Sequence, residues 1–570
     1  MKNCLKSSIV GTVKEKFRFG TLNFLFIIAY VNMFQWLFGP ENSIVGVIFT
    51  IMMSASMVRD LTATPFRHLV CQSAVLIWLV VAACLVNTLA APLSLAVNFV
   101  TVLLILYAYT YEYSAHIYFP YLLSYLFLVF ISPVGARQLP RRICGMAVGA
   151  VSIILYQLFM GRKRVVETAR DVLNEMIDDI CQMIGFRLGE QNEAPSLSGV
   201  RGRLCRLSQT VYERRKRILC VSEASFSMIG AGRGLEQLLV QITQLPEGLP
   251  EETKSFLENA RGQLNAFHAF LHQETDVLPD LQVPEASPFY DALRYIHDRM
   301  MHMTDPQSRV HYKKTGLSLK IRLQTALDLS PVRVTYALRT ALLLSLATLL
   351  VQTMGLPHGK WLLFTLASVS LPYADDVPLK MKKRLLATVI GGLASVVIYA
   401  LIPSAAGRTA AMMLSGYLSF YFTDYVETFA CSTVGALGGA VFMSSFGFQS
   451  VGSVFLIRLG YIVAGIAIGY VINCVIFPFS RKKATRQLWE KYKRVTELLS
   501  RVCHDRAADS QLYYHLVIQA LLLEEKLTQN ALLEQWTSFP DLLSRYQDLV
   551  RQAHRSSLAN WGEAVGAATP

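Results

Sequence analysis

The chain has 570 residues, of which 53% are hydrophobic and only 16% are charged, a balance that excludes an ordinary soluble, disordered or disulfide-stapled protein. Its 54 Lys and Arg outnumber its 40 Asp and Glu, which gives a net charge of +14. Because the basic residues gather beside apolar runs, the positive-inside bias of membrane proteins accounts for this charge, and we expect no nucleic-acid partner. The ten cysteines form no CxxC pair and indicate buried thiols.

Charged residues avoid two long blocks of the chain. Residues 21–160 hold eight charged side chains, and residues 340–480 hold eleven. A helix that crosses a membrane needs about 20 apolar residues, so each block is long enough for six short or average spans. The first block predicts spans near 21–38, 43–58, 69–87, 93–111, 117–135 and 143–160. The second predicts spans near 340–356, 361–373, 385–402, 409–423, 428–447 and 459–479.

The segments outside these blocks are predicted to be helical and cytoplasmic. Apolar residues recur there at intervals of three and four, which is typical of amphipathic helices, and breaks rich in Pro and Gly suggest antiparallel hairpins. Lys and Arg flank the spans mostly on the side that holds the amino terminus, which predicts that both termini are cytoplasmic. No cleavage site follows the first apolar run, so the first span is expected to remain in place. The predicted parts are a cytoplasmic N-terminal segment, a first six-helix transmembrane block, a cytoplasmic helical domain, a second six-helix transmembrane block and a cytoplasmic C-terminal helical domain, at 1–20, 21–160, 161–335, 336–480 and 481–570.

The two membrane blocks repeat a pattern at a nearly constant offset. Arg142 opens the sixth predicted span and Arg458 opens the twelfth, 316 residues later, and each is followed after seven residues by a glycine on the same helix face. Further pairs in the same order are Arg67 with Arg384, Glu112 with Asp424, and Tyr113 with Tyr425. The predicted fold is therefore an all-α membrane protein with two repeated six-helix transmembrane bundles, each followed by a cytoplasmic helical domain.

Three stretches carry a resemblance to a known family. They are VRVTYALRTALLLSLATLL, PLKMKKRLLATVIGG and IRLGYIVAGIAIGYVINCVIFP. In this order they resemble the fusaric acid resistance and aromatic acid exporter family of integral membrane transporters, closely over 335–480 and more loosely over 20–160. The resemblance implies a multi-pass protein of the cell (inner) membrane that exports aromatic or other organic carboxylates. It also implies a more distant likeness to plant anion channels.

The four arginines of the repeat are candidate substrate-binding residues. A desolvated guanidinium at the start of a helix attracts a carboxylate, and the helix dipole adds to the attraction. The alternative is that they are interface anchors whose side chains extend toward lipid headgroups, which the positive-inside bias favours for Arg67 and Arg384. Arg142 and Arg458 lie on the side where few basic residues are expected. Tyr113 and Tyr425 belong to an aromatic group that either stacks on a substrate or forms an interfacial belt.

Glu112 and Asp424 are candidates for proton coupling. A carboxyl group that is partly withdrawn from water has a raised pKa and can exchange a proton near neutral pH. The alternative is that these acids cap helices or pair with nearby basic residues in a turn.

Motifs of nucleotide, metal or cofactor chemistry are weak. The glycines of GAGRGLE follow no predicted strand, and His268 and His272 have helical spacing without a third ligand, so we expect no enzyme, metal or cofactor. The leading hypothesis is a secondary transporter with proton-coupled efflux of a small organic anion. The alternatives are a passive anion channel and a membrane scaffold whose cytoplasmic helices bind a partner, and a homo-oligomer is compatible with each.

Overall fold

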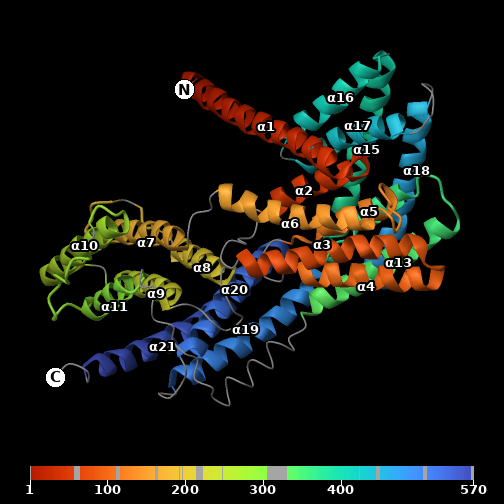
Figure 1. Ribbon diagram of the computed structural model, residues 1–570. Coiled ribbons are helices and arrows are strands. Elements are labelled where there is room, and N and C mark those ends of the chain that lie inside the picture. Colours follow the sequence, from red (N-terminus) through yellow and green to blue (C-terminus); the bar gives the residue numbers. More distant parts are fainter. Residues whose placement is uncertain are drawn as a thin grey trace. The chain divides into compact units, whose positions relative to one another are not determined.

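The computed structural model consists of helices and their connections throughout the part of the chain that it describes (Figure 1). The described residues are 2–56, 65–110, 116–160, 165–191, 193–195, 197–213, 223–246, 248–275, 277–303, 330–402, 404–422, 424–443, 450–504 and 510–566. The chain divides into two compact units. The first holds the apolar helices α1–α6 and α13–α18. The second holds α7–α11, α20, α21 and all of α19 except its first residue.

The first unit has a helix at each segment that the apolar runs predicted as a span. Its first half comprises α1 (Lys2–Phe38), η1 (Pro40–Asn42), α2 (Ser43–Ser56), α3 (Pro65–Thr88), α4 (Ala91–Tyr109), α5 (Tyr118–Phe130) and α6 (Leu139–Met160). Its second half comprises α13 (Pro331–Thr353), α14 (Lys360–Val369), η2 (Ala374–Asp376), α15 (Val377–Leu401), α16 (Ala405–Leu418), α17 (Tyr425–Met443), α18 (Ser450–Tyr470) and the π-helical turn η3 (Val471–Ile476).

Seven of these helical segments are long and apolar enough to cross a membrane, so the chain is a multi-pass membrane protein. They are Gly20–Phe38, His68–Thr88, Ala91–Tyr109, Leu139–Phe159, Pro331–Thr353, Ala374–Leu401 and Val451–Ile476. The apolar helices α5 and α14 are shorter. After ten residues α14 ends at Val369, and the backbone of the next residue, Ser370, is extended, so the chain leaves the helix inside the first unit.

Close helix crossings hold the second half of this unit together. Helix α15 packs against both α17 and α18 (Figure 1). At Gly391 an added Cβ would lie 2.4 Å from the carbonyl oxygen of Ala430, and at Gly392 it would lie 1.9 Å from the ring of Phe455. Only glycine allows helices to approach this closely, and the approach brings the polar residues of α14, α15, α17 and α18 near one another.

The second unit is a group of amphipathic helices with its own buried core. Its helices are α7 (Val165–Arg187), α8 (Leu197–Glu213), α9 (Glu223–Thr243), α10 (Glu251–Leu271), α11 (Tyr290–Met301), α19 (Arg481–His504), α20 (Ser510–Glu534) and α21 (Phe539–Gly566). The sequence predicted a separate helical domain after each membrane block. In the structure the two segments pack together, because α8 lies against α20.

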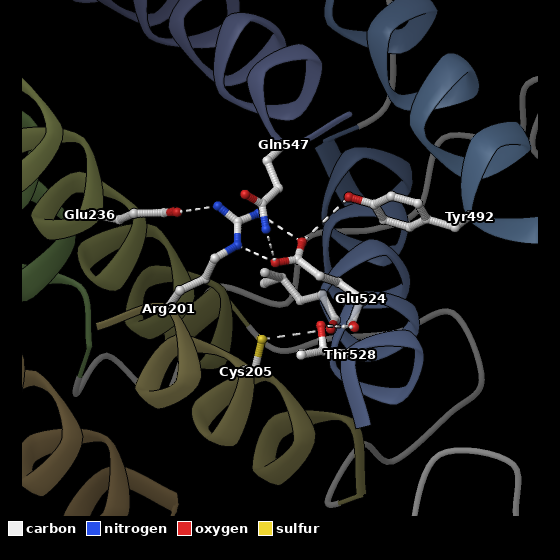
Figure 2. A network of polar contacts seen from close by, with 8 residues as sticks. Arg201, Cys205, Glu236, Tyr492, Glu524, Thr528 and Gln547 are labelled. Carbon is white, nitrogen blue, oxygen red and sulfur yellow. Dashed lines mark hydrogen bonds and ion pairs between the residues drawn. The ribbon is translucent and has the colours of Figure 1, made fainter. Parts of the chain in front are cut away.

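A buried polar network joins the two segments of this unit (Figure 2). Arg201 on α8 donates to Glu236 on α9 at 2.7 Å, and its Nη2 donates to Oε2 of Glu524 on α20, also at 2.7 Å. Gln547 on α21 donates to the same carboxylate at 2.7 Å, and the Tyr492 hydroxyl on α19 donates to it at 3.4 Å. Burial alone would lower the pKa of Arg201, but the charges of Glu524 and Glu236 outweigh burial and raise it, so Arg201 stays charged.

Candidate functional site

The buried arginines of the first compact unit, which we call the apolar unit, indicate where a binding site could lie, because a buried charge must find partners. Among the described residues of this unit, the buried guanidinium groups are those of Arg142, Arg339, Arg384, Arg408 and Arg458. Arg408 donates to the carbonyl oxygens of Ile402 and Tyr399, both at 2.8 Å, and so caps the end of α15. Arg339 likewise donates to the backbone carbonyls of Phe477 at 3.0 Å and Leu371 at 2.5 Å. These two arginines have structural partners.

Arg142, one of the predicted substrate-binding residues, is fully engaged, unlike Arg339, whose Nε atom has no hydrogen-bond partner among the described residues. Its side chain is 1% exposed in a turn of the first half of the unit. Its Nε donates to Oδ1 of Asn42 at 2.8 Å, and its Nη2 donates to the carbonyl oxygen of Glu41 at 2.6 Å and to the Ser132 hydroxyl at 2.8 Å. Its Nη1 donates to the carbonyl oxygen of Ser132. Because every guanidinium nitrogen has a partner, these contacts favour a structural role for Arg142.

Arg384 and Arg458 are buried without such partners. Their exposed fractions are 9% and 7%. The Nε atom of Arg384, and the Nε and Nη1 atoms of Arg458, have no hydrogen-bond partner among the residues that the structure describes. The guanidinium faces lie against rings instead: Arg384 is 5.1 Å from the centroid of Phe429, and Arg458 is 5.4 Å from that of Trp361. Ring contact occupies the faces, and the nitrogen edges remain available to an acceptor.

Tyr425 and Lys380 complete the cluster around Arg384. The hydroxyl of Tyr425 is buried and makes no hydrogen bond of good geometry within the described part of the chain, although the side chains of Arg384 and Ser368 lie close enough for a weaker hydrogen bond with it. The ammonium of Lys380 lies 3.5 Å from the centroid of the Tyr425 ring. We call Lys380, Arg384, Tyr425 and Arg458 the cationic cluster. It brings together three of the predicted substrate-binding residues.

The charge balance of the cationic cluster is strongly positive. The guanidinium groups of Arg384 and Arg458 repel each other, and Arg384 also repels Lys380. No carboxylate of the described residues acts on Arg458. Uncompensated buried cations are costly, and the cost falls when an anion accepts hydrogen bonds from them. The arrangement is therefore suited to binding an anion.

Asp424 precedes Tyr425 in the sequence, and both of its carboxylate oxygens already have partners. Its Oδ2 accepts a hydrogen bond from the backbone N–H of Val426 at 2.9 Å, and its Oδ1 lies 3.1 Å from the ammonium of Lys383. The hydrogen bond from Val426 and the contact with Lys383 hold the pKa of Asp424 below its usual value. These contacts favour the helix-capping alternative, and proton coupling through Asp424 stays a prediction.

The remaining predicted residues are not placed by the structure. Glu112 and Tyr113 lie outside the described residues. Arg67 lies in the first turn of α3, but its side chain also lies outside the description. Their proposed roles in substrate binding and proton coupling therefore stay predictions.

Sequence reasoning missed three members of the site and its surroundings: Lys380, Phe429 and Trp361. For Lys380 and Phe429, a spacing of four residues from a predicted site residue could have indicated that they belong to the site. Lys380 precedes Arg384 by four positions and Phe429 follows Tyr425 by four, so each pair shares one helix face. Trp361 gave no comparable signal, because its contact with Arg458 joins two different helices.

Residues 346–472 match the family model described as fusaric acid resistance protein-like, which confirms the resemblance over most of the second membrane block. The matched segment contains the whole cationic cluster. Families of this kind are transport-related membrane proteins. No curated protein and no solved structure matches the chain significantly.

Proposed function

We propose, with the fusaric acid resistance protein-like domain of residues 346–472 as the premise, that this chain is a secondary transporter that exports organic anions such as aromatic carboxylates. The observation that carries the proposal is the pair of buried guanidinium groups, Arg384 and Arg458, with unpartnered nitrogen atoms. Both belong to the matched domain, and a protein that only needed them as structural clamps would give them carbonyl partners, as it does for Arg339 and Arg408.

The chemistry of binding follows from the free donors. Both oxygens of a carboxylate accept hydrogen bonds. Charge-assisted bonds from guanidinium nitrogens are about twice as strong as hydrogen bonds between neutral groups. Arg384 and Arg458 supply the donors, and the hydroxyl of Tyr425 supplies one more. Binding compensates charges that are otherwise buried alone, so the affinity arises partly from relief of that cost. The rings of Trp361 and Phe429 border the donors with apolar surface that suits the body of an organic anion.

The finer architecture belongs to the same proposal. Two six-helix halves would flank the pathway, with both termini and the second compact unit in the cytoplasm. Positive-inside bias and the repeated arginines support this arrangement. The anion site would lie in the second half alone, because Arg142 in the first half has no free nitrogen.

A passive anion channel is the second candidate. The only predicted coupling acid that the structure describes, Asp424, is held ionised by Val426 and Lys383. A site that binds an anion without a proton acceptor would let the anion move down its own gradient. Proton-driven efflux would then need another titratable group.

Flux in proteoliposomes tests the proposal and separates the two candidates. The purified chain is reconstituted, and uptake of radiolabelled benzoate is followed with and without a pH gradient. A proton-coupled transporter accumulates benzoate above its equilibrium level only with the gradient, after correction for diffusion of benzoic acid through protein-free vesicles. A channel only speeds equilibration and gives single-channel currents. Lys382→Gln is the matched control, because Lys382 is an exposed cation on the same helix as Arg384. No flux above protein-free vesicles would contradict both candidates.

A further inference from the structure

A buried guanidinium group in the second compact unit has donors without acceptors. Arg233 lies in α9 and is 3% exposed. Its Nε and Nη1 atoms have no hydrogen-bond partner among the residues that the structure describes. Arg201 on α8, in the same unit, shows the usual arrangement, because its nitrogen atoms donate to Glu236 and Glu524. Since a buried charge without acceptors is costly, the free donors of Arg233 need an acceptor from elsewhere.

The glycines of GAGRGLE account for the burial of Arg233. Helix α9 packs against α7, α8 and α11 (Figure 1). At Gly232 an added Cβ would lie 2.9 Å from Cδ1 of Leu204 on α8. At Gly234 it would lie 2.6 Å from Cγ1 of Ile296 on α11. Glycine at both positions lets the neighbouring helices approach closely, so this motif serves helix packing and places Arg233 inside the unit.

The acids near this part of α9 already have partners. Glu236 follows Arg233 by three positions, and its Oε1 accepts a hydrogen bond from α8 at 2.7 Å. On α11, the carboxylate of Asp298 lies 3.7 Å from Nε of Arg299. Arg299 also approaches α9, because an added Cβ at Gly230 would lie 3.0 Å from its Cδ. The acids that could have paired with Arg233 therefore contact other groups.

The last turn of α19 does not supply an acceptor either. Burial raises the pKa of the Cys503 thiol on α19 to about 11, and the charge of Arg233 offsets this rise only in part. The thiol is thus neutral at physiological pH and gives Arg233 no negative charge. The negative end of the α19 dipole favours a cation nearby, but it leaves Nε and Nη1 of Arg233 without a hydrogen bond.

We propose that the second compact unit binds a small oxyanion, a carboxylate or a phosphate group, at Arg233. Its oxygen atoms would accept charge-assisted hydrogen bonds from Nε and Nη1, the donors that the fold leaves open. A bound anion stabilises the native state, so binding should strengthen the packing of α9 against its neighbours. The cationic cluster lies in the first unit. The proposal therefore goes beyond transport and does not depend on it.

Hydrogen exchange of the purified full-length chain tests this site, because it reports on α9 separately from the first unit. Inorganic phosphate and benzoate are added in separate series at constant ionic strength. At least one of them should slow exchange in α9 and α11 of the wild type in a saturable way, and the anion that does so identifies the class of ligand. Arg233→Gln should weaken the apparent affinity by about tenfold or more, the loss expected for a charge-assisted hydrogen bond.

Two control variants show whether the effect belongs to Arg233. Arg494 is an exposed arginine of the same unit, so Arg494→Gln should keep the wild-type affinity. Arg384→Gln changes the anion site proposed for the first unit and should leave the anion-dependent protection of α9 intact. Failure of the transport proposal and failure of this one are therefore distinguishable.

The stability of Arg233→Gln without added anion is a further test. The variant should be at least as stable as the wild type, because it removes a buried charge whose donors lack acceptors among the described residues. A strongly destabilised variant would overturn the proposal by showing that Arg233 supports the fold. The proposal would also be overturned if neither anion protects α9 in the wild type, or if folded Arg233→Gln responds as the wild type does.

Discussion

The Nε atom of Arg142 lies 2.8 Å from Oδ1 of Asn42, whereas Arg458, the residue 316 positions later, has no such acceptor in the part of the chain that the structure describes. The position that corresponds to Asn42 at the same offset is His358. Its ring stacks on Trp361, with centroids 5.0 Å apart. Two arginines at matching places in the sequence thus have different surroundings. Arg142 stabilises a turn through hydrogen bonds, and Arg458 has guanidinium donors without acceptors among the described residues.

Arg142→Gln should destabilise the protein. The change removes the donor to the carbonyl oxygen of Ser132 and to Oδ1 of Asn42, and leaves the carbonyl oxygen of Glu41 with the Ser132 hydroxyl as its donor, at a cost on the order of 3 kcal/mol. We expect a lower melting temperature and less monodisperse protein in detergent. A variant with wild-type stability would show that Arg142 is not a structural clamp.

Arg458→Gln should behave in the opposite way. It removes a buried charge that has no hydrogen-bonding partner among the described residues, so the substrate-free protein should be as stable as the wild type or more stable. The same change should remove the stabilisation that added benzoate gives the wild type. Thermal unfolding with and without benzoate measures both effects. A strongly destabilised variant would mean that Arg458 supports the fold.

Gly391→Leu should prevent normal assembly of the second half of the membrane unit. Its Cβ would lie 2.4 Å from the carbonyl oxygen of Ala430, so α15 and α17 would have to separate. Gly460→Ala is the matched control in α18, since nothing lies within 4 Å of the added Cβ. Alanine there should be neutral or stabilising by up to about 1 kcal/mol, as expected from helix propensity. Comparable melting temperatures for the two variants would contradict this packing.

Asp424→Asn tests capping against proton coupling. The folded-state pKa of Asp424 is lowered, so its stabilising effect is present above the ordinary pKa of an aspartate and is lost as pH falls through the lowered value. The stability difference between wild type and variant should therefore be present at pH 7 and shrink at strongly acidic pH. If Asp424 only caps α17, flux driven by a pH gradient should persist in the variant. Loss of that flux in a folded variant would support proton coupling.

The network in Figure 2 should govern the stability of the second compact unit. Arg201→Met leaves the carboxylates of Glu236 and Glu524 buried without their cation, at a cost of about 3–5 kcal/mol. Hydrogen exchange of the full chain should then speed up in both α8 and α20. Adding Glu236→Gln and Glu524→Gln should recover part of the protection. Faster exchange in α8 alone would show that the network does not join the two segments.

Local features of the sequence predicted the helices, and tertiary contacts decided the roles of the arginines. Apolar runs are local, so they located α1–α6 and α13–α18, the α-helices that the structure describes in the first unit. The partners of Arg142 lie up to about 100 residues away, and Arg201 pairs with Glu524 across 323 residues. No periodicity connects such positions. The repeat pattern therefore treated Arg142 and Arg458 alike, although only Arg458 keeps free donors.

Equilibrium binding of radiolabelled benzoate to the purified full-length chain tests the anion site most directly. The wild type should bind saturably, and Arg384→Gln and Arg458→Gln should each weaken binding by about tenfold or more, the loss expected for a charge-assisted hydrogen bond. Lys382→Gln should bind like the wild type. Undiminished binding by folded Arg384→Gln and Arg458→Gln variants would contradict the assignment of the cationic cluster as the anion site.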